Sequence, residues 1–577
     1  MKDWDLAALA AAAGAVVARP AGPIGGKDDL QQKTWPYARA RTATQSTIPQ
    51  DPPQSSVPRG SSRSPVPKGA IPQSPGPRSP VSRGPVRVNI DSRSIAQGDL
   101  FVGLPGERHD GGAYAAEALR AGAWGVLVTP GHAEALPAGG AVLVHEDPLA
   151  SLQSLAGAWL AELRAGGVKV VAITGSTGKT STKDILAALL GPKLPTFASP
   201  ANLNTEIGLP LAILGAPAGT KALVLEMAMR GQGQIAELTA IAEPDVGLIV
   251  NVGPVHLELL GTVAAVAAAK AELLEGLAPG ATAIVPAGEP LLEPYLREDL
   301  KTVRFGPGGD VRLAERRPDG TVVIEACVPV AASASRTADE LDGRLGIADR
   351  ARPALPERIA LKPSFGQAHN LENLVAAVAG ALALGVTPGG EVKVRFSAMR
   401  GQRVSLPGGT TVIDDCYNAN PMSMKAALDD LAETASGRRV AVLGDMLELG
   451  GDELSYHHEI GAYARARGVD FLLTVGPLAA AAADAFAGYG QACSVPDAIA
   501  AADLLTGALE PGDTVLVKGS RGVGLERVVE ALCGHGERPA RVGDRAEAQP
   551  GGREEPEVGG RDESRVAERA EPRAGGR

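Results

Sequence analysis

Residues 167–190 read GVKVVAITGSTGKTSTKDILAALL, and this stretch decides the fold class. The apolar, β-branched run at 168–173 predicts a buried strand, and Gly175 and Gly178 predict a tight turn after it. Lys179 then opens a run of helix-forming residues. A strand, a glycine-rich turn and a helix in this order are typical of a phosphate-binding loop in an α/β protein.

The chemistry of phosphate binding explains the residue types in this loop. Glycines let backbone N–H groups close around a polyphosphate, the helix N-terminus adds partial positive charge, and a lysine supplies a point charge. The Thr180 hydroxyl can reach Mg²⁺. Ile173 stands where the general pattern has Gly or Ala, so the loop is a shortened variant. We expect a nucleoside triphosphate, bound by Gly175, Ser176, Thr177, Gly178, Lys179, Thr180 and Ser181.

The bulk composition bounds the class of protein. A chain of 577 residues predicts about three or four domains. A formal net charge of −10 argues against a nucleic-acid binder, and no apolar run of about twenty residues indicates a membrane span. The apolar stretch 6–18 predicts a short amphipathic helix rather than a signal peptide. Cysteines without metal-ligand spacing indicate a reducing, cytoplasmic compartment and mostly core thiols: Cys327, Cys416, Cys493 and Cys533.

Composition also divides the chain into folded blocks and polar segments. Eleven prolines occur among the thirty-seven residues 49–85, so we expect a disordered, Pro/Ser-rich insert at about 20–85. The stretch 331–356 is expected to form a surface loop. The predicted domains are 1–165 around the insert, 166–392 and 393–535, followed by a disordered tail at 536–577.

Each folded block alternates apolar strands with helices, which predicts α/β domains on mostly parallel sheets. The expected strands are 100–104, 125–128, 141–144, 222–225, 246–250, 440–443, 471–474 and 514–517, and the expected helices are 113–121, 263–277 and 371–384.

An acid ends one of these strands. In LVLEMAMRGQGQ, Glu226 closes a buried-type strand and Arg230 follows in a glycine-rich loop. Ligands of open α/β sheets collect beyond the carboxyl ends of strands, so Glu226 is expected near the phosphate loop as a Mg²⁺ ligand. The alternative is a helix N-cap or a surface ion pair.

The next strand carries Asn251 and His256 into the loop that follows it. A lone histidine is more often structural than a ligand, and Mg²⁺ prefers oxygen donors, but His256 lies at the same sheet edge, so a structural and a functional role both stay open.

Lys270 is the least expected residue of the second block. It falls in an apolar stripe of the helix predicted from Val263, and no acid lies three or four residues away. The helix pattern alone favours snorkelling, in which the stem packs and the ammonium reaches water. The alternative is a buried amine whose lowered pKa keeps it neutral enough to take up CO₂ and become a carbamate.

A set of longer motifs occurs in order between Asn89 and about Leu532. They read NIDSRSIAQGDLFVGLPGERHDG, TGSTGKTS, NLNTEIGLPLAIL, NVGPVHLELLG with AAAKAEL, GQAHNLENLVAA, DDCYNANPMSM, VLGDMLELG and VLVKGSRGVGLE. This ordered set resembles the Mur ligase family. The resemblance implies three domains that bind a UDP-sugar, ATP and an amino compound in turn, with a central P-loop ATPase-type sheet and a Rossmann-like C-terminal domain.

The block DCYNANPMSM resembles the family members that add D-alanyl-D-alanine, because sibling ligases and folylpolyglutamate synthases carry a His-containing motif there. The implied reaction is ATP-dependent amide formation between UDP-N-acetylmuramoyl-tripeptide and D-alanyl-D-alanine through an acyl phosphate, in peptidoglycan precursor synthesis. A cytoplasmic monomer without nucleic-acid or membrane partners is implied. The sequence does not choose between diaminopimelate and lysine as the third residue of the tripeptide.

The resemblance also implies site residues, motif by motif. Thr180 and Glu226 would hold one Mg²⁺, and Glu226, His256 and a carbamate on Lys270 would hold a second, which reverses the preference for snorkelling. The other implied contacts are Ser92 and Arg93 with the UDP moiety; Asn370 with adenine; Arg400 and Asp415 with the nucleotide; Thr205, Glu206 and Arg230 near the reacting carboxylate; and Asn418, Asn420, Lys518, Ser520 and Arg521 with the dipeptide.

Two departures from the family pattern bear on these roles. Gln402 stands where the arginine motif usually has an acid, which leaves the choice between Arg400 and Arg403 open. The insert separates residues 1–18 from Val86, so the first domain is expected to close around a long excursion.

Two other function classes account less well for these residues. A P-loop kinase or GTPase would leave the longer motifs unexplained, and the chain lacks a guanine-reading Asn-Lys-x-Asp string. A non-catalytic paralogue conflicts with the presence of every nucleotide and metal candidate. A sibling ligase that adds a single amino acid is the weaker enzyme alternative.

Overall fold

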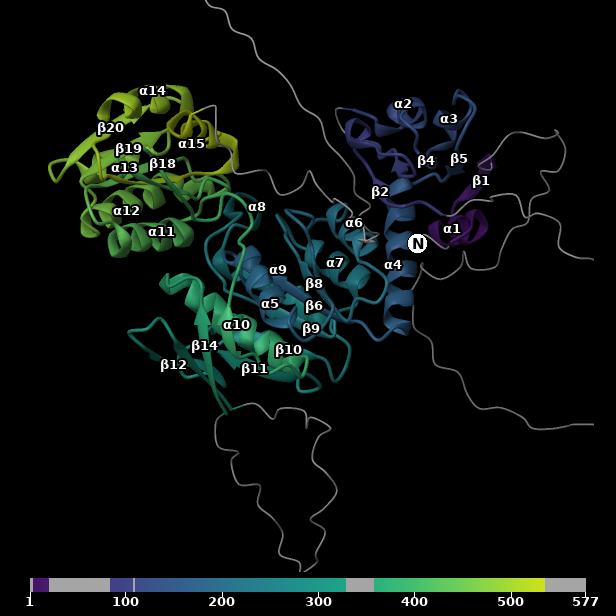
Figure 1. Cartoon of the computed structure of the whole chain (residues 1–577), viewed down its shortest axis with the longest axis horizontal. Coiled ribbons are helices and arrows are strands. Elements are labelled where there is room, and N and C mark those ends of the chain that lie inside the picture. Colours follow the sequence, from purple (N-terminus) through teal and green to yellow (C-terminus); the bar gives the residue numbers. More distant parts are fainter. Residues whose placement is uncertain (1–3, 20–83, 107–108, 328–356, 535–577) are drawn as a thin grey trace, which may run out of the picture. The chain divides into compact units, whose positions relative to one another are not determined.

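The computed structural model describes residues 4–19, 84–106, 109–327 and 357–534. These residues form three β-sheets with helices packed against them, which confirms the predicted α/β fold class (Figure 1). Except for residues 84 and 85, the predicted insert at about 20–85 lies outside the described ranges, as do the stretch 331–356 and the tail at 536–577.

The first sheet has five strands in the order β1-β5-β4-β3-β2. Helix α1 (Leu6–Ala13) and strand β1 come before the insert, and β1 pairs antiparallel with β5, whereas the other pairs are parallel. The stretch 6–18 is therefore a helix that stops at Gly14, where φ is +61°, and then a strand. The bounds are β1 (Val16–Arg19), β2 (Val88–Asn89), β3 (Leu100–Val102), β4 (Gly125–Val128) and β5 (Ala141–Val144), with α2 (Ala115–Arg120) and α4 (Pro148–Ala165).

The second sheet has ten strands in the order β15-β14-β13-β12-β11-β10-β9-β6-β8-β7. It is parallel from β7 to β12, and β13 then pairs antiparallel with both β12 and β14. The bounds are β6 (Lys169–Thr174), β7 (Thr196–Ala198), β8 (Ala222–Glu226), β9 (Val246–Ile249), β10 (Thr282–Pro286), β11 (Lys301–Phe305), β12 (Val311–Arg316), β13 (Val322–Ala326), β14 (Glu357–Pro363) and β15 (Gly390–Val392).

The antiparallel part of this sheet was not predicted, although the sequence carries a turn signal there. Strands β12 and β13 are joined through Asp319-Gly320, with Gly320 at φ +82° and a hydrogen bond from Arg317 N to Thr321 O. An Asp-Gly pair between short β-branched runs is a common hairpin connection.

Helices cover both faces of the second sheet. Val171 and Ile173 of β6 pack in one core with α5 (Lys179–Leu190) and α10 (Ala368–Ala383). Val170 and Ala172 point to the other face, which is covered by α6 (Gly208–Gly215), α7 (Gln234–Ala242) and α9 (Val263–Glu275). Because β6, β8 and β9 are parallel neighbours, the loops after them meet at one edge of the sheet.

The third sheet has six strands in the order β16-β17-β21-β18-β19-β20. Only β16, at the edge, is antiparallel to its neighbour within this sheet, so the domain is Rossmann-like. The bounds are β16 (Gln402–Ser405), β17 (Thr411–Asp414), β18 (Arg439–Gly444), β19 (Phe471–Val475), β20 (Gln491–Val495) and β21 (Thr514–Lys518), with α11 (Pro421–Thr434), α12 (Glu453–Ala466), α13 (Ala480–Phe486), α14 (Ala498–Ala508) and α15 (Glu526–Cys533).

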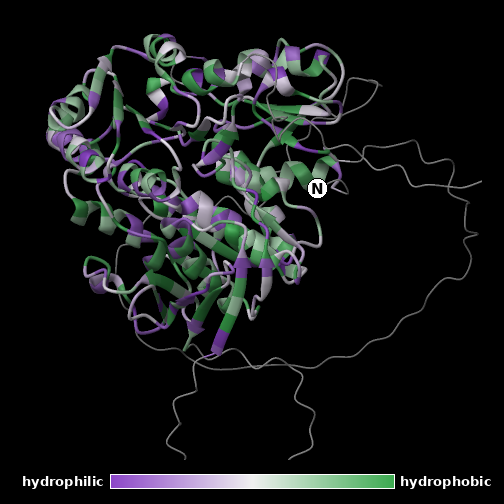
Figure 2. Cartoon of the chain, turned by 60° about the vertical axis from the view of Figure 1, so that its left-hand side comes forward, coloured by the Kyte–Doolittle hydropathy of each residue, from purple (hydrophilic) through white to green (hydrophobic). Residues whose placement is uncertain are grey.

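Hydrophobic residues concentrate on the strands, while the helices carry both kinds of residue (Figure 2). Within the described ranges, no helix combines the length and the apolar character needed to cross a membrane. The expectation of mostly core thiols is wrong: Cys416 is buried, but Cys327 is exposed and Cys493 and Cys533 are partly exposed.

Candidate active site

The phosphate loop connects β6 to α5. Gly178 precedes the first residue of the helix and has φ +76°, a conformation that favours glycine. A Cβ at this position would lie 2.4 Å from Oδ1 of Asn373 on α10, so a side chain does not fit. Gly178 thus lets the loop turn directly into α5. The N-terminus of the helix then lies at the loop, as phosphate binding requires.

Asn251, in the loop after β9, holds the phosphate loop in place. Its Oδ1 accepts from Thr177 N at 2.9 Å, its Nδ2 donates to Thr177 Oγ1 at 3.0 Å, and its backbone O accepts from Ser176 N at 3.1 Å. The Ser176 hydroxyl is paired with Gly253. The loop that follows β9 thus fixes the shape of the phosphate loop.

Glu226 lies at the carboxyl end of β8 and is 2% exposed. Its Oε2 accepts from Thr180 Oγ1 at 2.8 Å, and its Oε1 accepts from Asn204 Nδ2 at 2.8 Å. This carboxylate is neither a helix N-cap nor part of a surface ion pair, so the alternative reading of Glu226 is wrong. The expected proximity of Glu226 to the phosphate loop is confirmed.

Lys179 is held against its own loop, where its Nζ donates to Gly175 O at 2.7 Å. Burial lowers the pKa of its ammonium, the charge of Glu226 opposes this shift, and Arg400 adds to it.

Lys270 lies on α9, and its side chain is 2% exposed. No hydrogen bond or ion pair joins its ammonium to any residue in the described ranges. Burial, with a smaller contribution from the charge of Lys179, brings the pKa of Lys270 well below its ordinary value. A side chain that is 2% exposed packs in the interior rather than along the surface, which argues against snorkelling.

His256 precedes the short helix α8 (Leu257–Leu260) with φ +54°. Its Nδ1 lies 2.5 Å from Oε2 of Glu448, a residue of the third domain. Burial lowers the pKa of this imidazole, the Glu448 hydrogen bond opposes that shift, and the charges of Lys179 and Lys270 reinforce it. The two lysines and the histidine thus share one electrostatic environment.

The donor chemistry of these side chains fits Mg²⁺ in part. Thr180 and Glu226 offer adjacent hard oxygen atoms, which Mg²⁺ prefers. Within the described part of the chain, no three His, Cys, Asp or Glu side chains gather closely enough to hold a metal. A second ion at His256 would need a further oxygen donor, which Lys270 could supply only as a carbamate.

The two arginines of this motif have different partners. Arg400 Nη2 donates to Thr180 Oγ1 at 3.3 Å, and its guanidinium lies 4.0 Å from the centroid of the Tyr417 ring. Arg403 instead donates to both carboxylate oxygens of Asp430 at 2.8 Å. Arg400 is the one beside the phosphate loop. Gln402, the departure from the family pattern, accepts from Arg400 N at 2.8 Å.

Lys518, one of the expected dipeptide residues, is buried. Lys518 Nζ lies 2.7 Å from Asp415 Oδ2 and donates to Asn418 O at 2.9 Å. Asn420 caps α11 in a reciprocal pair with Ser423, so its side-chain oxygen is already used by the fold.

The remaining predicted contacts are dispersed. Arg93 is exposed and paired with Asp91, next to Ser92 in a short 3₁₀ turn of the first domain. Thr205 Oγ1 accepts from Gly208 N at 3.3 Å, and the neighbouring residue is Glu206. The structure brings neither of these pairs to the phosphate loop by a direct contact.

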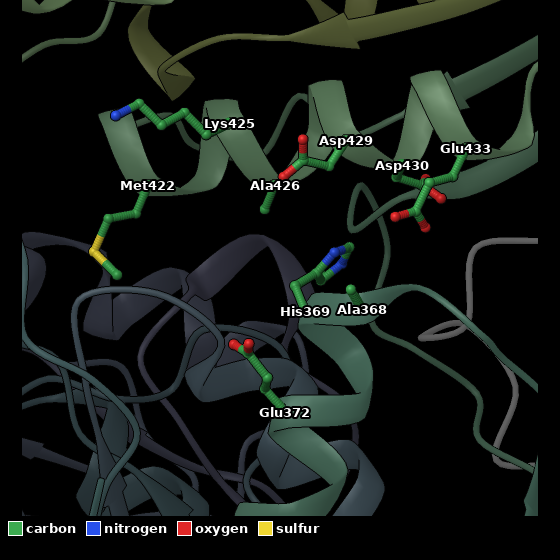
Figure 3. Close-up of a pocket in the computed structure, with 9 residues that line it drawn as sticks. All are labelled: Ala368, His369, Glu372, Met422, Lys425, Ala426, Asp429, Asp430 and Glu433. Atoms are coloured by element: carbon green, nitrogen blue, oxygen red, sulfur yellow. The ribbon is translucent and has the colours of Figure 1, made fainter. Parts of the chain in front are cut away.

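A cavity of about 200 Å³ opens between α10 and α11 (Figure 3). His369 points toward Asp429 and Asp430, with Glu372 one turn further along α10. Burial lowers the pKa of His369, and nearby Asp415 and Asp430 oppose that shift. A cavity lined by several carboxylates repels a polyphosphate, so any group held here must be neutral or cationic.

Comparison with known proteins identifies the family. Sequence models of three parts match in order: "Mur ligase family, catalytic domain" at residues 86–158, "Mur ligase middle domain" at 173–323, and "Mur ligase, glutamate ligase domain" at 399–521. The UDP-N-acetylmuramoyl-tripeptide–D-alanyl-D-alanine ligase of Bacillus subtilis (strain 168) is 34% identical over 454 residues, which cover 77% of this chain and 92% of the relative. The chain belongs to the Mur ligase family.

Solved structures of Mur ligases agree with this assignment. MurF from Acinetobacter baumannii superposes with a TM-score of 0.63 at 28% identity, covering 78% of this chain and 93% of the other. MurF ligase from Thermotoga maritima, solved in complex with ADP, superposes with a TM-score of 0.62 at 29% identity, covering 77% and 96%.

Three asparagines of this Mur ligase were missing from the predicted site. Asn251 shapes the phosphate loop, Asn204 orients Glu226, and Asn373 fills the space beside Gly178. Each lies within a quoted motif or next to a predicted residue, but its role depends on a contact between distant segments. Glu448, which contacts His256, was missed for the same reason.

Proposed function

We propose that the chain is an ATP-dependent ligase that joins D-alanyl-D-alanine to UDP-N-acetylmuramoyl-tripeptide in peptidoglycan precursor synthesis. The observation that carries this proposal is the 34% identity over 92% of a relative named for that reaction. The edge of the second sheet at the phosphate loop also supports it. Lys179 and Arg400 offer positive charge for a polyphosphate there, and Glu226 offers a carboxylate beside them.

ATP would lie on the N-terminus of α5. Residues 175–181 would hold its phosphates, since loop and helix offer backbone N–H groups and a lysine. Asn370 would face the adenine from α10, and Arg400 and Asp415 would approach the nucleotide from the third domain. Asn370 Oδ1 accepts from Nδ2 of Asn373, the residue beside Gly178, so Asn370 lies near the phosphate loop, which supports this placement.

Charge compensation is the main demand of the first step. Two like unit charges about 4 Å apart repel by roughly 4 kcal/mol at an effective dielectric near 20. Bound Mg²⁺ would supply positive charge against this repulsion. Thr180 and Glu226 would hold one ion, and Glu226, His256 and a carbamate on Lys270 a second. Lys179 and Arg400 would add fixed positive charge on the phosphate side.

The reaction balances as two displacements. A carboxylate oxygen of the tripeptide forms a bond to the γ-phosphorus while the bond to the β-γ bridging oxygen breaks, giving an acyl phosphate and ADP. The neutral amine of D-alanyl-D-alanine then bonds to the acyl carbon, inorganic phosphate leaves, and the nitrogen loses a proton. The protein acts mainly by positioning the reactants and excluding water from the acyl phosphate.

The carbamate forms by addition of CO₂ to the neutral Lys270 amine with loss of one proton. The burial and lowered pKa of Lys270 support it, because a neutral amine is the reacting form. A ¹³C resonance that appears with ¹³CO₂ and is missing from Lys270→Met would establish it. An identical spectrum for both proteins would disprove it.

The substrates would use the other two domains. Ser92 and Arg93 would hold the UDP moiety, while Thr205, Glu206 and Arg230 would lie near the reacting carboxylate. Asn418, Asn420, Lys518, Ser520 and Arg521 would hold the dipeptide. We further propose that the enzyme works in the cytoplasm as a monomer.

The test is a coupled assay of phosphate release and product mass with ATP, Mg²⁺ and UDP-N-acetylmuramoyl-tripeptide. D-alanyl-D-alanine is compared with D-alanine and with other single amino acids. We expect phosphate and a joined product only with the dipeptide. A product formed only with a single amino acid would assign the chain to a sibling activity, and ATP hydrolysis without any joined product would refute the proposal.

A further inference from the structure

Two strained residues meet at the candidate metal site. Five non-glycine residues in the described ranges have positive φ angles, and two of them, His256 at +54° and Glu448 at +66°, are in direct contact. Non-glycine residues hold such a conformation only where surrounding contacts fix it, and functional sites are where these conformations gather.

Glu448 receives two side chains and one backbone group from the second domain. Its Oε2 lies 2.5 Å from His256 Nδ1, and its Oε1 lies 3.5 Å from Arg230 Nε. Its backbone O accepts from Glu258 N at 3.2 Å. Gly450 packs as closely, since a Cβ there would lie 3.3 Å from Glu258 N. Residues 448–450 therefore dock on the loop that carries His256.

Residues 445–448 also contact the segment expected to hold the dipeptide. Leu447 N donates to Ser520 Oγ at 2.9 Å, and Ser520 N donates to Asp445 O at 3.0 Å. Met446 N donates to His457 Nε2 at 2.8 Å. Residues 445–448 thus form a short rigid link between the 518–521 loop and His256.

A carboxylate on one imidazole nitrogen determines what the other nitrogen can do. With Nδ1–H donating to Glu448, Nε2 carries the lone pair and is the nitrogen left to bind a metal. In metal sites, carboxylates placed in this way fix the tautomer and the orientation of the ring, and their loss typically weakens metal binding about 10- to 100-fold.

We propose that Glu448 is a positioning residue through which the third domain prepares His256 to bind the metal. This inference rests on the proposed function. Because the carboxylate and the ligand come from different domains, the histidine is fixed only when residues 445–450 are docked. Binding of the metal and binding of the dipeptide should therefore strengthen each other.

The test uses the full chain with Mn²⁺ as the probe metal and a non-hydrolysable ATP analogue. Free Mn²⁺ is measured by electron paramagnetic resonance, with and without D-alanyl-D-alanine. We expect Glu448→Ala to weaken Mn²⁺ binding about 10- to 100-fold and to abolish the effect of the dipeptide. Glu448→Gln, whose amide oxygen can still accept from Nδ1, should lie closer to the unchanged protein.

A matched control is Glu459→Ala, which removes a surface carboxylate of the third domain that pairs with Lys425 at 2.6 Å. It should leave Mn²⁺ binding unchanged. Thermal unfolding of all variants separates misfolding from a specific effect. In steady-state assays, Glu448→Ala should lower kcat while the KM for ATP stays unchanged, because the residue is not placed on the nucleotide.

Mn²⁺ binding by Glu448→Ala that equals that of the unchanged protein would overturn the inference, as would an equal loss in Glu459→Ala. Failure of the proposed function looks different. In that case the unchanged protein forms no joined product, whatever the variants do to Mn²⁺ binding.

Discussion

Two buried lysines of the second domain lie on opposite faces of the same sheet and have different environments. Lys183 on α5 and Lys270 on α9 are each 2% exposed. Lys183 Nζ donates to Ser199 O at 2.8 Å and lies 3.4 Å from Asp184 Oδ1. Lys270 has no such partner among the described residues, and burial brings its pKa well below the ordinary value.

The comparison teaches that burial alone does not mark a functional lysine. A buried ammonium with a carbonyl and a carboxylate is part of the fold, and Asp184 in turn accepts from Ser397 N at 2.8 Å. A buried amine without a partner costs stability, and strongly perturbed pKa values of this kind gather at functional sites, so we propose a chemical role for Lys270. Lys183 is therefore the matched control for Lys270.

The largest expected effect is on turnover. Lys270→Met should lower kcat by at least about 10²- to 10³-fold, because the site loses the group that would complete its charge. Lys183→Met should keep most of the turnover per folded molecule. Steady-state phosphate release checks both. Retention of most activity in Lys270→Met would contradict a chemical role for Lys270.

Stability should change in the opposite order. Lys183→Met leaves Ser199 O without its partner in the interior, which should lower the free energy of unfolding by about 2–3 kcal/mol. Lys270→Met replaces an unpaired buried amine with an apolar chain and should leave stability equal or higher. Urea unfolding followed by circular dichroism measures both. A larger loss in Lys270→Met than in Lys183→Met would contradict this account.

The two arginines repeat the contrast between an available and a paired side chain. Arg400→Gln should raise the KM for ATP about tenfold, because Arg400 lies beside Thr180 at the phosphate loop. Arg403→Gln should leave that KM unchanged and lower the unfolding temperature, since it separates Arg403 from Asp430. The reverse assignment of the two effects would identify Arg403 as the nucleotide contact.

The smallest expected effect is the pH dependence of stability. The folded pKa of Lys270 is below its unfolded value, so between these two values the unfolded chain holds the extra proton. In CO₂-free buffer, the stability of the unchanged protein relative to Lys270→Met should rise with pH in this window, by at most about 1.4 kcal/mol per unit. Denaturant titrations at a series of pH values below the ordinary pKa of 10.5 measure it. A difference that falls with pH would contradict the lowered pKa.

The sequence predicted those features that depend on neighbouring residues in the chain. The phosphate loop, the α/β class and the position of Glu226 at a strand end all follow from local periodicity and from the geometry of parallel sheets. The hairpin at Asp319-Gly320 also has a local signal, because an Asp-Gly pair is a common hairpin turn.

Features that depend on distant contacts could not be predicted. Helical spacing places Lys270 in an apolar stripe but does not say whether another element covers its ammonium. The link between Glu448 and His256 joins residues 192 positions apart. The pairing of Arg403 with Asp430 of α11 likewise joins two segments that no local pattern connects.

The most direct test of the central claim follows an oxygen atom. UDP-N-acetylmuramoyl-tripeptide labelled with ¹⁸O in its terminal carboxylate is incubated with ATP, Mg²⁺ and D-alanyl-D-alanine, and mass spectrometry is applied to the phosphate and the peptide product. The account predicts one ¹⁸O in each released phosphate and a product enlarged by the dipeptide. Consumption of ATP with unlabelled phosphate and no enlarged product would contradict it.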